Sequence, residues 1–187
     1  MPSRRAFLLS VGAVALPATA KTRRVEVGVC GAIDDFAKAV QYGFDYFEGA
    51  AAGIAALNDR AFAGFREHVL ASRLRCKRFN SFIRTLQVVG PNANPDAVSS
   101  YVSSTLDRCR QLGASIVVWG SASSRNVPEG YSREKAWQQI KDFLRSAGDI
   151  ARSKNVLLAI EPLRRQESNI VNSGAEALRL VHDVQSS

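Results

Sequence analysis

The sequence predicts an α/β protein, a partial barrel of the (β/α), or TIM-barrel, type with about five βα units. Short apolar segments alternate five times with segments whose apolar residues recur at helical spacing. Each expected strand and helix together take roughly 25 to 45 residues, as parallel βα units require. The strands are short and rich in valine and isoleucine, and no Gly-x-Gly-x-x-Gly motif follows the first one, which disfavours a dinucleotide-binding sheet. A complete barrel needs eight units and roughly 250 residues, so five units form only part of one.

The first half of the chain contains three of the expected strands. Residues 25–30 alternate apolar and polar side chains before an apolar run, which is typical of a strand. A helix over 34–42 follows, with Asp34 or Asp35 as its cap and Gly43 at its end. Further on we expect a strand over 45–49, a helix from 58 or 59 to about 72 with Phe62, Phe65 and Val69 in the core, and a strand over 76–83.

The second half contains the longer helices. Pro95 predicts the start of a helix that runs to about Leu112, and Gly113 ends it. Next come a strand over 115–119, a loop over 120–131, a long helix from Ser132 to Ser153, a strand over 156–160 and a last helix over 174–184.

Composition and charge indicate a globular protein. Hydrophobic residues make up 46% and charged residues 22% of the chain. The net charge of +8 could indicate nucleic-acid binding, but the basic residues are scattered and not interleaved with aromatic ones. We interpret them as solvated helix faces with a weak attraction for anionic substrates, and we expect no nucleic-acid partner.

Neither the cysteines nor the histidines have the spacing of a metal site. Cys30, Cys76 and Cys109 are far apart and odd in number, so packed thiols are expected, with one disulfide as an open alternative. His68 and His182 fall in expected amphipathic helices, where a structural role is the simpler interpretation.

Residues 1–20 are typical of an export signal. Arg4 and Arg5 form a positive region, and Phe7 to Leu16 form an apolar segment too short for a stable membrane span. The order of Ser3, the two arginines, Phe7 and Leu8 resembles the bacterial twin-arginine signal, with an ordinary secretory signal as the alternative. Either kind of signal predicts a periplasmic or extracellular protein. Residues 21–187 would then form the barrel segment.

A candidate catalytic residue stands at the end of the fifth strand. Glu161 follows the apolar run 156–160 directly, and Glu167 lies six residues further on. A carboxylate at the end of an apolar strand is costly unless it is paired, hydrogen-bonded or bound to a metal. In parallel α/β sheets this end is also where active sites form. The structural alternative is a glutamate that accepts hydrogen bonds from loop amides.

Three segments resemble one known group of enzymes. LLAIEPLRRQESN at the fifth strand carries most of the resemblance, and VVWGSASSRNVPEGYS and DYFEG add to it. They resemble the sugar phosphate isomerase/epimerase superfamily, the xylose isomerase-like TIM barrels, which include hydroxypyruvate isomerase, tagatose-type 3-epimerases and inosose dehydratase. The resemblance covers roughly residues 25–187.

The resemblance implies a metal-dependent sugar or sugar phosphate isomerase or epimerase that transfers a proton next to a carbonyl. Glu161 would bind a divalent metal and act as one of two catalytic acid/bases, and Glu167 would contact a substrate oxygen near the reacting carbon. Mn²⁺, Mg²⁺ or Zn²⁺ would stabilise the enediolate that the proton transfer generates. The substrate would be a small sugar or hydroxy-carbonyl compound.

Other positions would complete the substrate site. Trp119 and Gly120 would line the pocket floor, with Trp119 offering an apolar face to the sugar. Asn80 and Ser81 could donate hydrogen bonds to hydroxyls, with a plain loop role as the alternative. Arg125 could contact a phosphate, with a solvated loop arginine as the simpler alternative.

The chain departs from the family pattern after the fifth strand. The family's remaining metal ligands, an Asp, a His and a second Glu, lie on later strands, whereas here only Gln185, Ser186 and Ser187 follow the last expected helix. We therefore expect a C-terminally truncated barrel. The alternatives are a catalytically inactive family member, a half-barrel binding module, or two chains that associate as a homodimer to complete a barrel.

Overall fold

The computed structural model describes residues 25–184. The predicted signal segment, residues 1–20, lies outside the described residues. Within them, no helix combines the length and the apolar character needed to cross a membrane.

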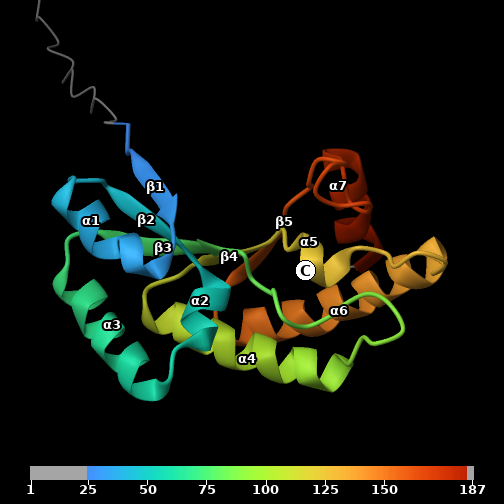
Figure 1. Cartoon of the computed structure of the whole chain (residues 1–187), viewed down its shortest axis with the longest axis horizontal. Helices are drawn as coiled ribbons and strands as arrows, with labels where there is room; N and C mark the ends of the chain where they lie inside the picture. Colours follow the sequence, from blue (N-terminus) through green and yellow to red (C-terminus); the bar gives the residue numbers. More distant parts are fainter. Residues whose placement is uncertain (1–24, 185–187) are drawn as a thin grey trace, which may run out of the picture.

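Five parallel strands form one sheet whose spatial order follows the sequence, which confirms the predicted α/β fold (Figure 1). Because every neighbouring pair is parallel, the carboxyl ends of all five strands lie along one edge. The register aligns these ends: Cys30 pairs with Glu48, and Trp119 with Ile160. The strands are β1 (Gly28–Gly31), β2 (Tyr46–Ala50), β3 (Arg75–Asn80), β4 (Ile116–Trp119) and β5 (Leu157–Ile160).

Helices connect the strands, and α3, α4 and α6 lie along one side of the sheet in Figure 1. The described elements are η1 (Ile33–Asp35), α1 (Phe36–Gln41), α2 (Ala51–Ala56), α3 (Asp59–Ala71), α4 (Pro95–Gln111), α5 (Ala122–Arg125), α6 (Arg133–Ser153) and α7 (Gly174–Val184). The long helices begin where the sequence predicts, because the side chains of Asn58, Asn94 and Ser132 each accept a hydrogen bond from a first-turn amide.

Two short helices fall outside the sequence prediction. Helix α2 follows β2 directly, and α5 lies in the segment expected to be a loop after β4. Both are too short for an apolar periodicity to be visible in the sequence. They matter for the site because each one starts at the carboxyl edge of the sheet.

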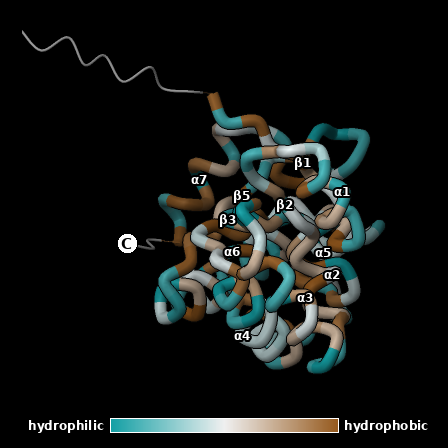
Figure 2. The backbone as a smooth tube through the Cα atoms, turned by 90° about the vertical axis from the view of Figure 1, so that its left-hand side faces the viewer, coloured by the Kyte–Doolittle hydropathy of each residue, from teal (hydrophilic) through white to brown (hydrophobic). Residues whose placement is uncertain are grey.

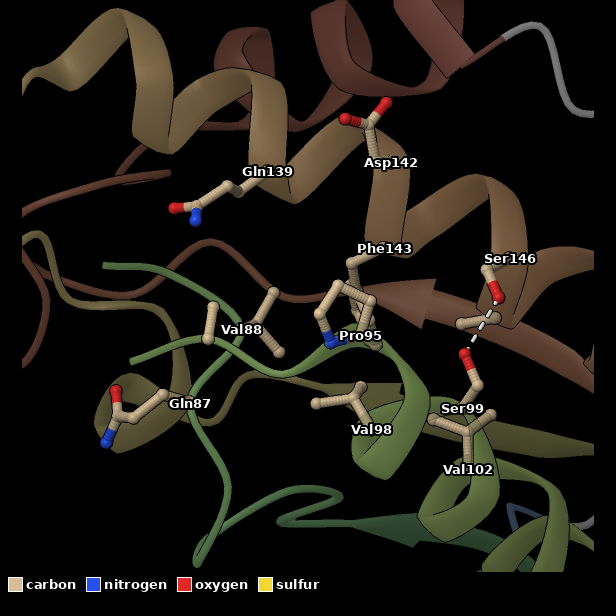
Figure 3. A pocket seen from close by; sticks show the side chains of 12 residues that line it. Gln87, Val88, Pro95, Val98, Ser99, Val102, Gln139, Asp142, Phe143 and Ser146 are labelled. Atoms are coloured by element: carbon tan, nitrogen blue, oxygen red, sulfur yellow. Dashed lines mark hydrogen bonds between the residues drawn. The ribbon is translucent and has the colours of Figure 1, made fainter. Parts of the chain in front are cut away.

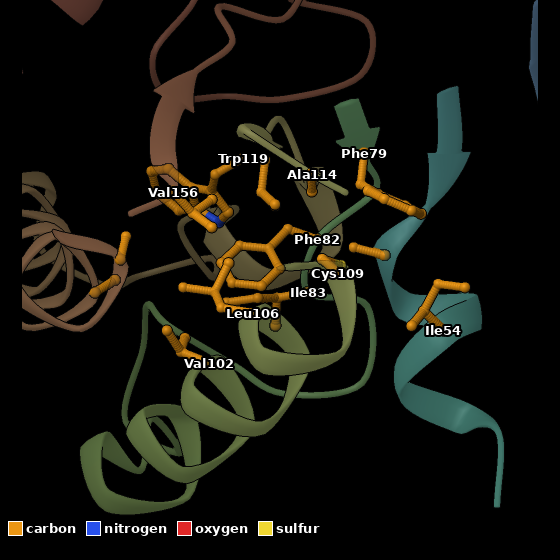
Figure 4. Close-up of a cluster of buried hydrophobic side chains, with 14 of the residues drawn as sticks. Ile54, Phe79, Phe82, Ile83, Val102, Leu106, Cys109, Ala114, Trp119 and Val156 are labelled. Carbon is orange, nitrogen blue, oxygen red and sulfur yellow. The ribbon is translucent and has the colours of Figure 1, made fainter. Parts of the chain in front are cut away.

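The core lies between the sheet and its helices, and in Figure 2 hydrophobic segments gather around the strands. Figure 4 shows Phe79 and Trp119 from the sheet and Leu106 from α4 in one cluster of buried side chains. All three side chains are fully buried, and each contributes about 1.5–3 kcal/mol of stability. Of the predicted core residues on α3, Phe62 and Val69 are buried and Phe65 is partly buried.

Candidate functional site

A cavity of about 880 Å³ opens at the carboxyl edge of the sheet. Strands β2 to β5 and the loops that follow them supply its walls. Its lining residues are Glu48, Asn80, Ser81, Arg84, Val118, Gly120, Ser121, Ala122, Ser123, Ile160, Glu161, Pro162, Leu163 and Glu167. The sequence predictions at Asn80, Gly120, Glu161 and Glu167 therefore converge on one cavity.

Glu161 extends the pairing of β4 and β5 by one residue, because its amide donates to the Trp119 carbonyl at 3.2 Å. Its side chain is exposed, and its carboxylate makes no hydrogen bond or ion pair with any residue from 25 to 184. The loop amides of this segment therefore do not satisfy it. A carboxylate that is open to a cavity is available to a ligand.

Gly120 leaves the space that the Glu161 side chain occupies. A Cβ atom at Gly120 would lie 2.8 Å from Cδ and 3.1 Å from Cβ of Glu161. Any larger residue at Gly120 therefore displaces the carboxylate. Gly120 is therefore needed in the pocket floor because it has no side chain to collide with Glu161, a reason that the sequence alone does not show.

Arg125 holds the backbone beneath this carboxylate. Its guanidinium is fully buried and donates to three carbonyls: Glu161 at 2.8 Å, Trp119 at 3.4 Å and Val171 at 3.4 Å. The guanidinium carbon also lies 5.2 Å from the centre of the Trp119 ring. Burial lowers the Arg125 pKa to about 10, while the Glu161 carboxylate acts to raise it, so the arginine is charged at neutral pH.

Both expectations for Arg125 are therefore wrong. It is not solvated, and it does not line the cavity where a phosphate would bind. The reason is the short helix α5, which folds the segment after β4 back toward the sheet and carries Arg125 at its end. A buried cation needs several acceptors, and the ends of β4 and β5 provide them.

The ends of the first three strands carry a second polar cluster. The Asn80 amide nitrogen donates to Glu48 Oε1 at 3.1 Å and to Cys30 Sγ at 2.9 Å. Adjacent strands β1, β2 and β3 bring these residues together at one edge. Asn80 thus lines the cavity, as predicted. Its amide oxygen accepts no hydrogen bond from any residue between 25 and 184, so it is open to a donor on a ligand.

Glu167 reaches the cavity from the loop after β5. Its carboxylate is paired with Arg164 at 3.1 Å, and its amide donates to the Arg164 carbonyl at 2.9 Å. This turn presents Glu167 to the same cavity as Glu161. The two glutamates of the most specific sequence segment therefore share a site.

Trp119 does not line the cavity, so its predicted sugar-facing role is wrong. It is fully buried in the core, its ring centre lies 4.8 Å from that of Phe143, and its indole nitrogen donates to Ser124 at 3.3 Å (Figure 4). Successive side chains on a strand point to opposite faces. Val118 and Gly120 therefore face the cavity and Trp119 faces the helices.

In the loop after β3, sequence reasoning placed Ser81 at the substrate site but missed Arg84. Ser121 Oγ accepts the Ile83 amide at 3.0 Å, and Ser123 Oγ lies 3.3 Å from the Arg84 carbonyl, to which it donates. These bonds hold the loop against α5, so that Arg84 lines the cavity. Ser81, at the start of this loop, has a φ of 48°, a conformation that non-glycine residues adopt at a cost. Its position beside Asn80 was the only sequence signal.

The described residues alone do not fit a divalent metal. Within 25–184 there is no group of three or more His, Cys, Asp or Glu side chains placed to hold an ion. A carboxylate needs further protein ligands to hold a catalytic cation. Glu161 is one such group, and the two other carboxylates of the cavity are engaged by Asn80 and Arg164.

Cys76, Cys109 and one of the histidines are packed as structural groups, whereas Cys30 is exposed and not a packed thiol as expected. The three cysteines are free, so the structure has no disulfide among residues 25–184. Burial raises the pKa of Cys76 and of Cys109 to about 12, which keeps both thiols protonated. His68 packs against Phe36 with 5.2 Å between ring centres.

A smaller hollow of about 170 Å³ lies between α4, α6 and the loop before α4 (Figure 3). Val98 and Phe143 contribute apolar walls, and Ser99 and Ser146 hydrogen-bond across it at 3.2 Å. No predicted site residue lines this hollow. The candidate site is therefore the larger cavity at the strand ends.

Solved structures with the same fold include several sugar epimerases. The apo 3-keto-D-glucoside 4-epimerase of E. coli is 14% identical with a TM-score of 0.71, and covers 88% of this chain and 66% of its own. A D-allulose 3-epimerase from Methylomonas sp. is 21% identical with a TM-score of 0.70, over 87% of this chain and 60% of its own. The IolI protein with a binding zinc atom is 16% identical with a TM-score of 0.65, over 86% and 59%.

These similarities establish the fold, and this chain spans only about three fifths to two thirds of each structure's length. Comparison with curated proteins gives no match. A family model described as xylose isomerase-like TIM barrel matches residues 36–187. The chain belongs to the xylose isomerase-like TIM barrel family.

Proposed function

We propose that the protein is a sugar isomerase or epimerase that transfers a proton next to a carbonyl group. The observation that carries this proposal is the Glu161 carboxylate, which directly follows β5, lines the cavity and has no hydrogen-bond or ion-pair partner among residues 25–184. The fold neighbours support it, because several of them are sugar epimerases by name. The substrate is a small sugar or a related hydroxy-carbonyl compound.

Glu161 is proposed as the acid/base of the reaction. Its carboxylate takes a proton from the carbon beside the carbonyl, and the electron pair of that C–H bond moves toward the carbonyl oxygen to form an enediolate. Return of this proton by Glu161 to the neighbouring carbon, with transfer of the hydroxyl proton to the carbonyl oxygen, gives an isomer. An epimer forms when a second donor, such as a water molecule, protonates the same carbon from the opposite face. Arg125 holds the Glu161 backbone in place during both steps, through its 2.8 Å bond to the Glu161 carbonyl.

Asn80 and Glu167 are proposed to orient the substrate. Their side chains line the cavity on either side of β4, Asn80 from the end of β3 and Glu167 from the loop after β5. The Asn80 amide oxygen and the Glu167 carboxylate can each accept a hydrogen bond from a sugar hydroxyl. Two such contacts hold the reacting carbon at a fixed distance from Glu161.

A divalent metal belongs to the proposal only together with ligands from outside residues 25–184. When bound, Mn²⁺, Mg²⁺ or Zn²⁺ would supply positive charge for the developing oxyanion. Glu161 would be the contribution of the described residues to such a centre. One fold neighbour, the IolI protein, is described with a zinc atom.

A sugar-binding module without turnover is the second candidate function. Its support is that Glu161 is the one lining carboxylate without a hydrogen-bond or ion-pair partner among residues 25–184, whereas Asn80 bonds Glu48 and Arg164 pairs with Glu167. The two candidates share a ligand class and differ in chemistry.

We also propose export to the periplasm or beyond, on the strength of residues 1–20.

Incubation of the full chain with a panel of ketoses and aldoses tests the proposal, with and without added Mn²⁺, Mg²⁺ or Zn²⁺. Glu161→Gln should lower the rate of interconversion by about 10²–10⁴-fold, the usual contribution of a general base. Glu129→Gln is the matched control, because Glu129 is an exposed loop glutamate outside the cavity. Wild-type turnover by Glu161→Gln would refute the proposed role. Saturable sugar binding with no turnover under any metal would favour the binding module.

A further inference from the structure

Arg84 is a cation with no partner in the cavity. It lies in the loop after β3, and its side chain makes no hydrogen bond or ion pair with any residue from 25 to 184. Its backbone is fixed from two sides, because Ser121 binds the Ile83 amide and Ser123 binds the Arg84 carbonyl. The guanidinium is thus free, but it is attached to an anchored segment.

Two of the three glutamates that line the cavity have side-chain partners. Glu48 accepts a hydrogen bond from Asn80, and Glu167 is paired with Arg164. Glu161 alone among the lining carboxylates has no such bond within the described part of the chain. The cavity therefore presents two side chains of opposite charge, Arg84 and Glu161, that have no hydrogen-bond or ion-pair partner among residues 25–184, with the end of β4 between them.

The spacing of these two charges limits the ligand. Arg84 follows β3 and Glu161 follows β5, and two strand intervals amount to roughly 10 Å before the long arginine side chain is extended. A single small anion on Arg84 would not bring a reacting carbon to Glu161. A chain of several carbons with an anionic group at one end and a carbonyl toward the other would reach both.

Guanidinium geometry selects the anionic group. Its parallel N–H groups match the paired oxygens of a carboxylate or a phosphate, with two hydrogen bonds at once. Arg125 cannot serve this purpose because its guanidinium is buried and bonded to backbone carbonyls. The positive net charge of the chain, +8, also favours the approach of an anion.

We propose that Arg84 binds the carboxylate or phosphate group of the hydroxy-carbonyl compound on which Glu161 acts. The substrate class is then a sugar acid or a sugar phosphate, and a neutral sugar is a poor ligand. This inference rests on the proposed function for the reaction at Glu161. The binding of the anion at Arg84 can be measured without any turnover.

Calorimetric titration of the full chain with three probes tests the inference. Fructose is the neutral probe, fructose 6-phosphate the phosphate probe and glucuronate the carboxylate probe. We expect one or both anionic probes to bind more tightly than fructose. Arg84→Gln should weaken the tighter anionic probe by about 10-fold or more, as loss of a charged hydrogen bond implies, and leave fructose unchanged. Arg84→Lys should retain part of the phosphate affinity, because it keeps the charge and loses the fork.

Arg165→Gln is the matched control. It removes one positive charge from the exposed loop after β5, outside the cavity lining, and should change each dissociation constant by less than about twofold. Equal binding of neutral and anionic probes, no binding of either anion, or an equal effect of Arg165→Gln would overturn the inference. Selective loss of anion binding in Arg84→Gln without turnover of any probe would support Arg84 and contradict the proposed function instead. Turnover of fructose at the same rate by the wild type and by Arg84→Gln would support the proposed function and contradict the role of Arg84.

Discussion

Substitution of Arg125 by methionine should loosen the backbone that carries Glu161. The variant loses the 2.8 Å bond to the Glu161 carbonyl, which as a bond from a charged donor is worth about 1.5–3 kcal/mol. The two bonds of 3.4 Å, to the carbonyls of Trp119 and Val171, are longer than a normal N–H···O hydrogen bond and contribute less stability. Removal of a buried charge, whose Nε has no partner within 25–184, returns part of this loss. We expect a net destabilisation of about 2 kcal/mol, which lowers Tm by roughly 4–8 °C in a chain of this size.

Amide hydrogen exchange locates the effect. In Arg125→Met, exchange should accelerate at the Glu161 amide, which is bonded to the Trp119 carbonyl, and at the Leu163 amide, which is bonded to the Val171 carbonyl. Both acceptors are carbonyls that Arg125 also binds. Urea denaturation gives the free energy of unfolding of the whole chain, and the exchange data are corrected for its change.

Arg108→Met is the matched control. Arg108 also binds several backbone carbonyls, those of Ile54, Ala55 and Leu57, at the end of α2. Its loss should cost comparable stability but leave exchange at Glu161 and Leu163 unchanged after the same correction. Stability of Arg125→Met within about 0.5 kcal/mol of the wild type, the range of an ordinary surface substitution, would refute the reasoning. Equal exchange profiles in the two variants would refute it as well.

Two further predictions follow from packing and burial. Gly120→Ala should displace the Glu161 carboxylate, because the new Cβ would lie 2.8 Å from its Cδ. We expect this variant to lose sugar turnover and binding while its Tm changes little. Unchanged activity would show that the carboxylate needs no fixed position. The folded-state pKa of Cys76 and Cys109, about 12 against an ordinary 9.0, predicts stability that is complete below pH 9 and declines as pH rises toward 12, because only the unfolded state releases these protons there. Urea denaturation below and above pH 9 should show this decline, and the double variant Cys76→Ala, Cys109→Ala should reduce its slope; an equal slope in both proteins would contradict the burial argument.

Much of the fold is readable in the sequence because local signals coincide with tertiary ones. Asn94 and Pro95 mark the start of α4, and Asn58, one of the two residues at which the helix was expected to begin, caps α3. The apolar run before Glu161 predicted a strand that ends at the site edge, and β5 is that strand. Short helices such as α5 escape this kind of reasoning, because their stability comes from contacts made after folding.

The candidate site was only partly predictable for the same reason. Asn80, Gly120, Glu161 and Glu167 follow from position along the chain, since strand ends meet at one edge. Trp119 lies outside the site because side chains alternate along β4, which turns Val118 and Gly120 toward the cavity and Trp119 into the core.

The two arginines show where local reasoning ends. Arg125 is buried and Arg84 lines the cavity, the reverse of what a loop position suggests for Arg125. The difference depends on α5 and on hydrogen bonds between Ser121, Ser123 and the loop after β3. These are contacts between segments far apart in the sequence.

Solvent deuterium uptake is the sharpest test of Glu161 as a base. The full chain is incubated in D₂O with the best-bound ketose and a divalent metal, and deuterium at the carbon beside the carbonyl is followed by NMR. We predict uptake by the wild type and by Glu129→Gln, and a loss of about 10²-fold or more in Glu161→Gln. Uptake by Glu161→Gln at the wild-type rate would contradict proton transfer by Glu161.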